Sequence, residues 1–291
     1  MLAKLPPQLS SYRFLSIGAV GFVYQIDSCV VLKFPRDQND ECFSREVEIF
    51  DLFEKHSPCP DIVQSFLRVP QGNFLAYLSG GTLEQRLRGN KKGKEPLSAI
   101  ERWAMELSNA TAWLESLGYI HGDIRPPNIL FDGHDHLKLT DFDSVAEIGT
   151  RYDGAAPPWA RLLGPEAGDE NGTFGRCGAK TEQFAIGSII YFATRRYEPY
   201  EMEDLGEDRG PRVVELLQRM KFPDLSGGRL DRIIEQCWNG QFATLKELAE
   251  ETSLLPGANE QPRATPLDKV HCEEIRRKCQ RLVENGLLTM A

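Results

Sequence analysis

Apolar residues recur along this chain with two different spacings, and each spacing predicts a type of element. Short apolar runs bounded by turn residues are typical of β-strands, and this pattern dominates residues 14–34. Apolar residues three and four positions apart indicate helices, most clearly over residues 98–117. We expect strands at residues 14–17, 23–26, 30–34, 62–69, 74–78, 129–131 and 137–139, and helices at residues 40–56, 98–117, 181–194, 211–220, 229–238, 242–252 and 270–284.

The helix expected at residues 98–117 carries its own start and stop signals. Ser98 and Glu101 have the spacing of a capping box, in which each side chain bonds the backbone N–H of the other residue. Gly118 is suited to end the helix, because glycine adopts a positive φ without steric cost. Such a helix would support the loop that follows it.

Composition restricts the class of protein. Of the 291 residues, 41% are hydrophobic and 26% are charged, as in soluble globular proteins. The net charge of -9 argues against a nucleic-acid partner, since phosphate backbones require a basic surface. The N-terminus lacks an apolar core of signal-peptide length, and the longest apolar run, residues 184–193, is too short to span a bilayer. We therefore expect no membrane partner.

Cysteine usage indicates the compartment. The seven cysteines are scattered, odd in number and without a Cys-x-x-Cys pair. Free thiols are therefore expected rather than disulfides or a zinc site. This expectation favours an intracellular location, either cytoplasmic or nuclear.

One stretch concentrates oxygen-bearing side chains at fixed spacings. Asp123 lies five residues before Asn128, and Asp141 follows thirteen residues later. Two short apolar runs between Asn128 and Asp141 predict a hairpin that brings these two side chains together. Their oxygens suit Mg²⁺, which prefers carboxylate and carbonyl ligands alongside phosphate. Asp123 would stand nearby to orient an attacking hydroxyl and accept its proton.

The same residues carry a family resemblance. The segment His-Gly-Asp-x-x-x-x-Asn at residues 121–128, followed by Asp-Phe-Asp at residues 141–143, resembles the catalytic and metal loops of the eukaryotic protein kinases. The resemblance implies an α+β, bilobal fold with a small β-rich N-lobe that holds one main helix and a larger, mainly helical C-lobe. It places a kinase-like domain at residues 12–252, with the N-lobe at about 12–78, the hinge at about 76–82 and the C-lobe at about 83–252, and it leaves residues 253–291 as a linker and a final helix.

Further matches to this family lie near the N-terminus. Gly18, Gly21 and Val23 match the Gly-x-Gly-x-x-Gly-x-Val loop, with Ser16 in place of its first glycine, and Lys33 resembles the lysine of the Val-Ala-Ile-Lys strand. The resemblance implies that ATP binds here and that the hinge backbone, through the carbonyl of Ala76 and the N–H of Leu78, holds the adenine. The nucleotide-binding residues that it implies are Ile17, Gly18, Ala19, Val20, Gly21, Val23, Lys33, Ala76 and Leu78.

A glutamate in the helix at residues 40–56 is expected to pair with Lys33. In the kinase family a glutamate of this helix fixes the strand lysine that positions the nucleotide phosphates. Glu46 follows Lys33 by thirteen residues, and Glu48 is an alternative. Glu46 is preferred because apolar residues follow it as they do in the family.

The activation segment would run from residue 141 to residue 166, ending in Gly-Pro-Glu where the family has Ala-Pro-Glu. Gly122 replaces the arginine that in many kinases binds a phosphate on this segment. We therefore expect a segment that phosphorylation does not switch on. Its hydroxyl groups after Asp141 are Ser144, Thr150 and Tyr152. Alanine at Thr150 or Tyr152 should then leave activity unchanged.

Three further positions depart from the family pattern. Trp159 replaces a threonine that helps to position peptide substrates, and Glu182 replaces an aspartate that holds the backbone of the catalytic loop. The arginine that usually pairs with the final glutamate of the activation segment is missing, and Gln241 and Phe242 occupy its region. These changes, with Gly122 and Asp143, leave more than one function open.

The resemblance supports three functions. The leading one is a protein kinase that uses ATP and Mg²⁺ to phosphorylate serine or threonine hydroxyls of a protein substrate. In it Arg125, where such kinases usually have lysine, neutralises charge on the γ-phosphate. The first alternative is a pseudokinase that binds nucleotide without turnover. The second is a small-molecule phosphotransferase of the aminoglycoside or choline type, to which the two catalytic motifs are also similar. The final helix would pack on the larger lobe or remain free for a partner.

Overall fold

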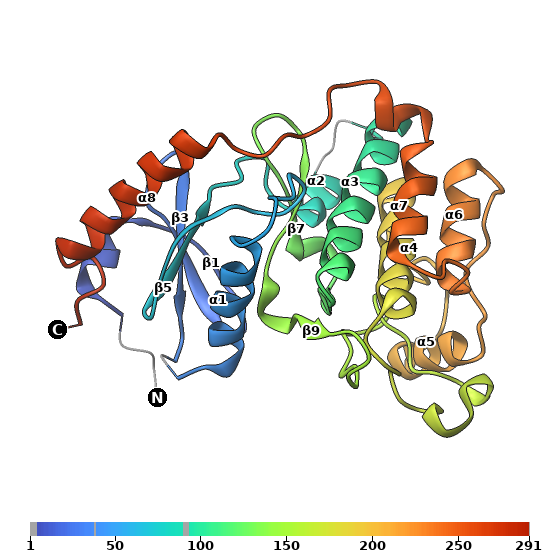
Figure 1. Ribbon diagram of the computed structural model, residues 1–291. Coiled ribbons are helices and arrows are strands. Elements are labelled where there is room, and N and C mark those ends of the chain that lie inside the picture. The colour runs from blue at the N-terminus through green and yellow to red at the C-terminus, as the bar shows by residue number, and fades with distance from the viewer. Residues whose placement is uncertain (1–4, 38, 90–92, 291) are drawn as a thin grey trace.

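The computed structural model describes residues 5–37, 39–89 and 93–290, which fold into two lobes (Figure 1). The N-terminal lobe is built on a five-stranded antiparallel sheet with the order β1-β2-β3-β5-β4, and the C-terminal lobe is mainly helical. The expected α+β, bilobal fold is thus confirmed. The strands of this sheet are β1 (Arg13–Ile17), β2 (Gly21–Gln25), β3 (Val30–Pro35), β4 (Ser65–Val69) and β5 (Gly72–Ala76).

The sheet is covered on both faces. Every residue of β3 is buried, and alternate residues enter two different cores, because successive side chains of a strand point to opposite faces. Val31 belongs to the large core that continues into the C-lobe, whereas Val30 and Leu32 belong to a second core under the opposite face. Lys33, two residues after Val31, therefore points to the same side as Val31.

Helix α1 (Glu41–Phe53) lies beside this sheet (Figure 1). Asp40 caps its N-terminus, and the side chain accepts hydrogen bonds from the amides of Cys42 (2.8 Å) and Phe43 (3.1 Å). The buried face of the helix carries Phe43, Glu46, Ile49, Phe50 and Phe53. A carboxylate thus lies in the middle of an otherwise apolar stripe, which requires a partner charge inside the lobe.

The C-lobe is organised around α4 (Ala179–Arg195), whose central residues are buried all round. Helix α4 packs against α6 and α3, and α3 packs in turn against α7. Among the described residues, no helix combines the length and the apolar character needed to cross a bilayer. The other helices of this lobe are α2 (Leu83–Gly89), α3 (Leu97–Ser116), α5 (Arg209–Gln218), α6 (Arg229–Trp238) and α7 (Leu245–Ser253).

The capping box expected at the start of α3 is wrong. The helix begins at Leu97 with Pro96 in the cap position, and no side-chain hydrogen bond caps it. The carboxylate of Glu101 instead accepts a hydrogen bond from the amide of Gly257, at 2.7 Å. A distant segment therefore takes the acceptor that the local pattern assigned to the helix start. The expected stop is confirmed, since Gly118 follows the helix with a φ of +87°.

Two short antiparallel strand pairs lie at the catalytic stretch. Strand β7 (Ile129–Phe131) pairs with β8 (Leu137–Leu139), and β6 (Tyr119–Ile120) pairs with β9 (Ala146–Glu147). The first pair is the expected hairpin between Asn128 and Asp141. The second joins the start of the catalytic loop to the segment that follows Asp143.

The C-terminal segment crosses from the large lobe to the small one (Figure 1). Helix α8 (Lys269–Glu284) packs against β4 and the second core of the sheet. Its residues Ile275 and Cys279 lie in that core with Leu32, Phe66 and Phe74. The expectation that this helix packs on the larger lobe or remains free is therefore wrong, because its apolar face covers the smaller lobe.

Candidate active site

The β7–β8 hairpin brings Asn128 next to Asp141. Ile129 and Leu139 are paired in the ladder, and Thr140 donates to the carbonyl of Asn128 from both its amide and its hydroxyl, each at 3.0 Å. Asp141 then adopts a left-handed conformation, with φ 68° and ψ 73°. This turn directs the chain away from the hairpin and leaves the Asp141 carboxylate free to reach β3.

Lys33 lies between two carboxylates. Its Nζ is 2.5 Å from Glu46 Oε2 on α1 and 2.5 Å from Asp141 Oδ1. Burial alone would lower the pKa of the Lys33 ammonium, but the charges of Glu46 and Asp141 outweigh it and raise that pKa. Lys33 is therefore a fixed cation that joins β3, α1 and the end of the hairpin. Its partner on α1 is Glu46 rather than the exposed Glu48.

Asp123 is held by two neighbours in its own loop. Asn128 Nδ2 donates to the carbonyl oxygen of Asp123 (2.8 Å) and to its Oδ2 (2.9 Å), and Arg125 Nε lies 2.9 Å from the same Oδ2. Burial raises the pKa of Asp123 to about 6, against the opposing effects of Arg125 and Asn128. A carboxylate with such a pKa is suited to accept a proton near neutral pH.

His121 and Glu182 fix the backbone on which Asp123 stands. The carboxylate of Glu182, on α4, accepts hydrogen bonds from the amides of His121 (2.9 Å) and Gly122 (3.2 Å). His121 Nδ1 accepts from the amide of Asp123 (3.2 Å), so its Nε2 donates to the carbonyl of Thr140 (2.9 Å). Burial lowers the pKa of His121 to about 4, which agrees with a neutral ring. The extra methylene of Glu182 thus does not prevent the contact that the family makes with aspartate.

An aromatic cluster connects α1 to the catalytic loop. The ring of Phe142 is fully buried and lies edge-on to Phe50 (5.3 Å), Phe53 (5.3 Å) and His121 (5.0 Å between ring centroids). Such edge-to-face packing is favourable and fixes the rings relative to one another. The position of α1, and hence of Glu46, is therefore coupled to the residues around Asp141.

The glycine-containing turn lies between β1 and β2. Ile17 ends β1 and is 56% exposed, and the turn of Gly18, Ala19 and Val20 is closed by a hydrogen bond from the Gly18 amide to the carbonyl of Gly21 (2.8 Å). A Cβ on Gly21 would lie 2.7 Å from the carbonyl oxygen of Phe34, so the glycine is needed for pairing with β3. Val20 is buried beneath the turn, whereas Val23 in β2 is partly exposed.

The connection between the lobes follows β5. Ala76 ends that strand, and its amide donates to the carbonyl of Gln64, while the amide of Tyr77 donates to Cys29, each at 2.8 Å. Leu78 follows as a buried residue. Gly80 then donates to the carbonyl of Phe131 at 2.9 Å, which fixes the connection against β7.

The oxygen donors of the site fit a hard divalent cation. Because the amide nitrogen of Asn128 bonds Asp123, its amide oxygen is directed away from Asp123. Asp141 keeps a partly exposed side chain, and Asp143 adds a second carboxylate in the same segment. Among the residues that the structure describes, no group of three or more His, Cys, Asp or Glu forms a cage made of protein alone. This donor set suits Mg²⁺, which commonly takes one or two protein carboxylates and completes its shell with phosphate and water.

The activation segment is held by contacts that sequence reasoning missed. Tyr152 is buried and its hydroxyl donates to the carbonyl of Gly122 at 3.0 Å. Glu166, whose usual arginine partner is absent, pairs with Arg161 of the same segment at 2.7 Å. Trp159 is buried against Phe192 of α4. No spacing rule signals these partners, because each depends on how the segment folds back on the lobe.

Fold and site together define a two-lobed kinase-like protein with a complete lysine, glutamate and aspartate set. A family model described as the protein kinase domain matches residues 29–239, and the chain belongs to this family. Members of the family generally use ATP and Mg²⁺.

Curated relatives include several plant kinases. The chain is 26% identical over 277 residues to CBL-interacting protein kinase 28 of Oryza sativa subsp. japonica, covering 87% of this chain and 61% of the relative. It is 29% identical over 172 residues to CBL-interacting protein kinase 11 of the same organism, covering 57% and 33%. It is 25% identical over 180 residues to CBL-interacting serine/threonine-protein kinase 20 of Arabidopsis thaliana, covering 56% and 40%. The matched regions thus span between a third and about three fifths of the length of these relatives.

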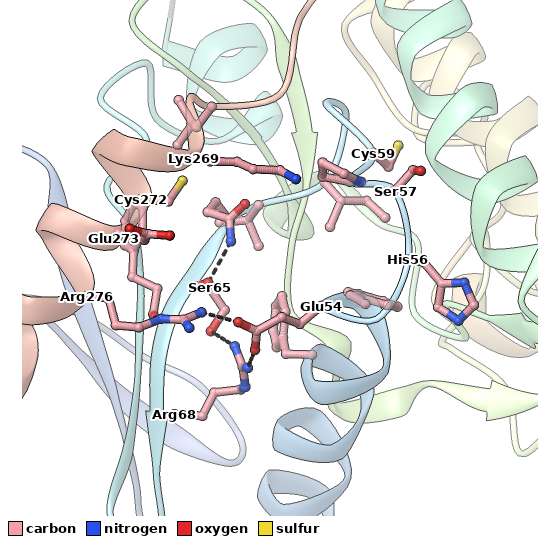
Figure 2. A pocket seen from close by; sticks show the side chains of 18 of the residues that line it. Glu54, His56, Ser57, Cys59, Ser65, Arg68, Lys269, Cys272, Glu273 and Arg276 are labelled. Carbon is pink, nitrogen blue, oxygen red and sulfur yellow. Dashed lines mark hydrogen bonds and ion pairs between the residues drawn. The ribbon is translucent and has the colours of Figure 1, made fainter.

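A separate pocket lies at the C-terminal end of α1, between that end, β4 and α8. Its volume is about 420 Å³, and Lys33, Asp123 and Asp141 do not line it. Figure 2 shows Arg68 and Arg276 converging there on Glu54, while Lys269 extends across the opening. The Nε of Arg276 also donates to the carbonyl of Phe66 at 2.8 Å. Glu54 therefore connects the end of α1 to the C-terminal helix.

Proposed function

We propose that this protein is a protein kinase that transfers the γ-phosphoryl group of ATP, with Mg²⁺, to serine or threonine hydroxyls of a protein substrate. The observation that carries the proposal is the position of Lys33, bonded at once to Glu46 and Asp141. Phosphoryl transfer in protein kinases requires this lysine–glutamate ion pair and an aspartate, in the position of Asp141, that holds Mg²⁺. The name of one relative, a serine/threonine-protein kinase, supports the choice of hydroxyl.

Each residue then has a defined role. MgATP, when bound, supplies the phosphoryl group and a cation that neutralises the phosphate charge. Lys33 would hold the α- and β-phosphates, and Asn128 and Asp141 would hold the metal. Asp123 orients the substrate hydroxyl and accepts its proton. Positioning and charge neutralisation provide most of the rate in such transfers.

Arg125 adds a charge beside the base. Its side chain is 44% exposed and its guanidinium contacts Asp123, so it can turn toward the γ-phosphate when a substrate hydroxyl contacts Asp123. Arginine keeps the charge of the lysine usual at this position but presents a planar donor group. The nucleotide base is held by the backbone at Ala76 and Leu78, under the turn formed by residues 17–23.

The decisive experiment measures phosphate incorporation from labelled ATP, with Mg²⁺, into peptide and protein panels. The wild-type protein should incorporate phosphate, and Asp123→Asn should reduce the rate at least about 10³-fold while ATP with Mg²⁺ still raises the melting temperature. Lys33→Met should remove both the activity and the nucleotide-dependent shift. Asp169→Asn and Lys55→Met, at exposed positions away from the cleft, should match the wild type.

The two alternatives give different results in the same assay. A nucleotide-induced shift without incorporation into any acceptor would identify a pseudokinase. Incorporation into small alcohols but not into peptides would identify a small-molecule phosphotransferase. The proposed intracellular location, cytoplasmic or nuclear, is tested separately by imaging a fluorescent fusion.

A further inference from the structure

The phenol of Tyr152 joins the activation segment to the catalytic loop. Its hydroxyl donates to the carbonyl of Gly122 at 3.0 Å and accepts from the amide of Ala155 at 3.2 Å. The side chain is 8% exposed, and its ring lies edge-on to Phe174, with centroids 6.1 Å apart. Both hydrogen-bonding roles of this hydroxyl are therefore used inside the lobe.

Gly122, which receives this bond, is unusually dependent on outside support. It has a φ of +81°, and a Cβ there would lie 2.4 Å from the carbonyl oxygen of Ser144. Only glycine fits this position in the observed backbone arrangement, where the family has arginine. Glycine, however, also leaves its backbone freer to rotate than any other residue does. The backbone of Gly122, just before Asp123, is therefore not restricted by a side chain of its own and depends on hydrogen bonds from other residues.

The peptide plane between Gly122 and Asp123 is bonded at both of its polar groups. Its carbonyl accepts from Tyr152, and its N–H, which belongs to Asp123, donates to His121 Nδ1 at 3.2 Å. The preceding amide, that of Gly122, donates to Glu182. A rotation of this plane would break both hydrogen bonds and change the φ of Asp123, on which the direction of its side chain depends.

We propose that Tyr152 is a positioning residue that fixes the orientation of Asp123 without phosphorylation of the activation segment. This inference rests on the proposed kinase function. It replaces the expectation that alanine at Tyr152 leaves activity unchanged. The hydroxyl does by a neutral bond to the catalytic-loop backbone what a phosphate bound to arginine does in many relatives of the family.

The test removes the hydroxyl and keeps the ring. Tyr152→Phe should lower kcat about tenfold or more, because a small misorientation of a general base is costly. The KM for ATP and the shift in melting temperature with ATP and Mg²⁺ should stay within about twofold of wild type. Replacement of Tyr152 by p-aminophenylalanine, which restores a donor to the Gly122 carbonyl, should recover most of the lost kcat.

Tyr200→Phe is the matched control. Tyr200 is 2% exposed, and its hydroxyl donates to the carbonyl of Lys221 at 2.8 Å, away from the catalytic loop. This variant loses a bond of the same kind, so it should lose similar stability and keep its kcat. An unchanged kcat in Tyr152→Phe, or an equal loss of kcat in Tyr200→Phe, would overturn the inference.

Hydrogen exchange separates failure of this inference from failure of the proposed function. In the absence of nucleotide, Tyr152→Phe should speed exchange at the amides of Asp123 and Ala155 at least about fivefold, and Tyr200→Phe should not. If the wild-type protein transfers no phosphate but Tyr152→Phe still exchanges faster at these amides, the kinase proposal is refuted and the role of Tyr152 in holding the loop is kept. Unchanged exchange in an active enzyme would refute that role alone.

Discussion

Asp123 combines a buried environment with two partners that favour its charged form. Its side chain is 15% exposed, and burial raises its pKa to about 6, while Arg125 and Asn128 limit the rise. At neutral pH the group is therefore a carboxylate, yet it is a stronger proton acceptor than an exposed aspartate. A base of this kind works best when its pKa lies just below the operating pH.

The pH dependence of kcat tests this environment. In its proposed role as the base, Asp123 must be unprotonated, so kcat should fall tenfold per pH unit below about pH 6 and level off above it. The charge of Arg125 lowers the pKa of Asp123, so Arg125→Ala should move the midpoint to higher pH. Arg277→Ala, on the exposed side of α8, should leave the midpoint in place. A kcat that does not change between about pH 5 and about pH 8 would contradict the role of Asp123 as base.

Sequence spacing predicted that some of these residues lie close together, and it did not predict the position of others. Asp123, Asn128 and Asp141 lie on one short stretch, so a single hairpin determines their neighbourhood. The contact of Tyr152 could not be predicted, because its hydroxyl bonds a backbone carbonyl thirty residues away along the chain. In the sequence Tyr152 is only one hydroxyl of a segment that we expect phosphorylation not to switch on, and its burial in the lobe carries no sequence signal.

At the scale of elements, β3 and α1 act as a unit through one ion pair. The Lys33–Glu46 contact crosses from the sheet to the helix, and Phe142 packs against the same helix from the catalytic side. If α1 moved away from the sheet, the Lys33–Glu46 pair would separate and the contact of α1 with Phe142 would break at the same time. Two independent contacts, the ion pair and the aromatic packing, thus stabilise the conformation in which α1 packs against the sheet and the catalytic loop.

Two glutamates of α1 provide a sharp comparison. Glu46→Gln should lower kcat/KM about 100-fold, because Lys33 loses the charge that directs it toward the phosphates. Glu48→Gln, two residues away on the exposed face, should stay within about twofold of wild type. Steady-state kinetics on peptide substrate, with circular dichroism to check folding, provide the measurement. Equal losses in the two variants would show that the ion pair has no specific role.

Elements with strong local patterns were predicted closely, and those set by distant contacts were not. Asp40 caps α1 where the pattern placed a helix start. The short helix α2, Leu83–Gly89, escaped prediction because two turns carry too little periodicity to be distinguished from a loop. The capping box of α3 failed because the helix begins at Leu97, which leaves Ser98 inside it, and Glu101 instead accepts from Gly257, 156 residues along the chain.

At the scale of the whole molecule, the C-terminal segment belongs to both lobes. It contacts α3 through Gly257 in the large lobe and covers the sheet of the small lobe with α8. Arg276 adds a polar link to Glu54 at the end of α1. The segment is therefore part of the folded unit, a placement that the charged pattern of residues 270–284 did not reveal.

The stability contribution of α8 can be measured with two residues of the helix. Ile275 is 9% exposed within the second core, whereas Val270 is 62% exposed. Ile275→Ala should lower the free energy of unfolding by about 3 kcal/mol, and Val270→Ala should change it by less than about 0.5 kcal/mol. Urea denaturation followed by tryptophan fluorescence gives both values. Equal effects would mean that α8 is not docked on the sheet in solution.

The burial of one thiol offers a way to follow this docking without any added label. Cys279 is fully enclosed between α8 and the sheet, and burial raises the pKa of its sulfur to about 12. An alkylating reagent can reach this sulfur only when α8 separates from the sheet. The rate at which Cys279 is modified, measured by mass spectrometry, therefore reports how often α8 detaches. The same rate, measured with and without nucleotide, shows whether a ligand in the distant cleft slows the detachment.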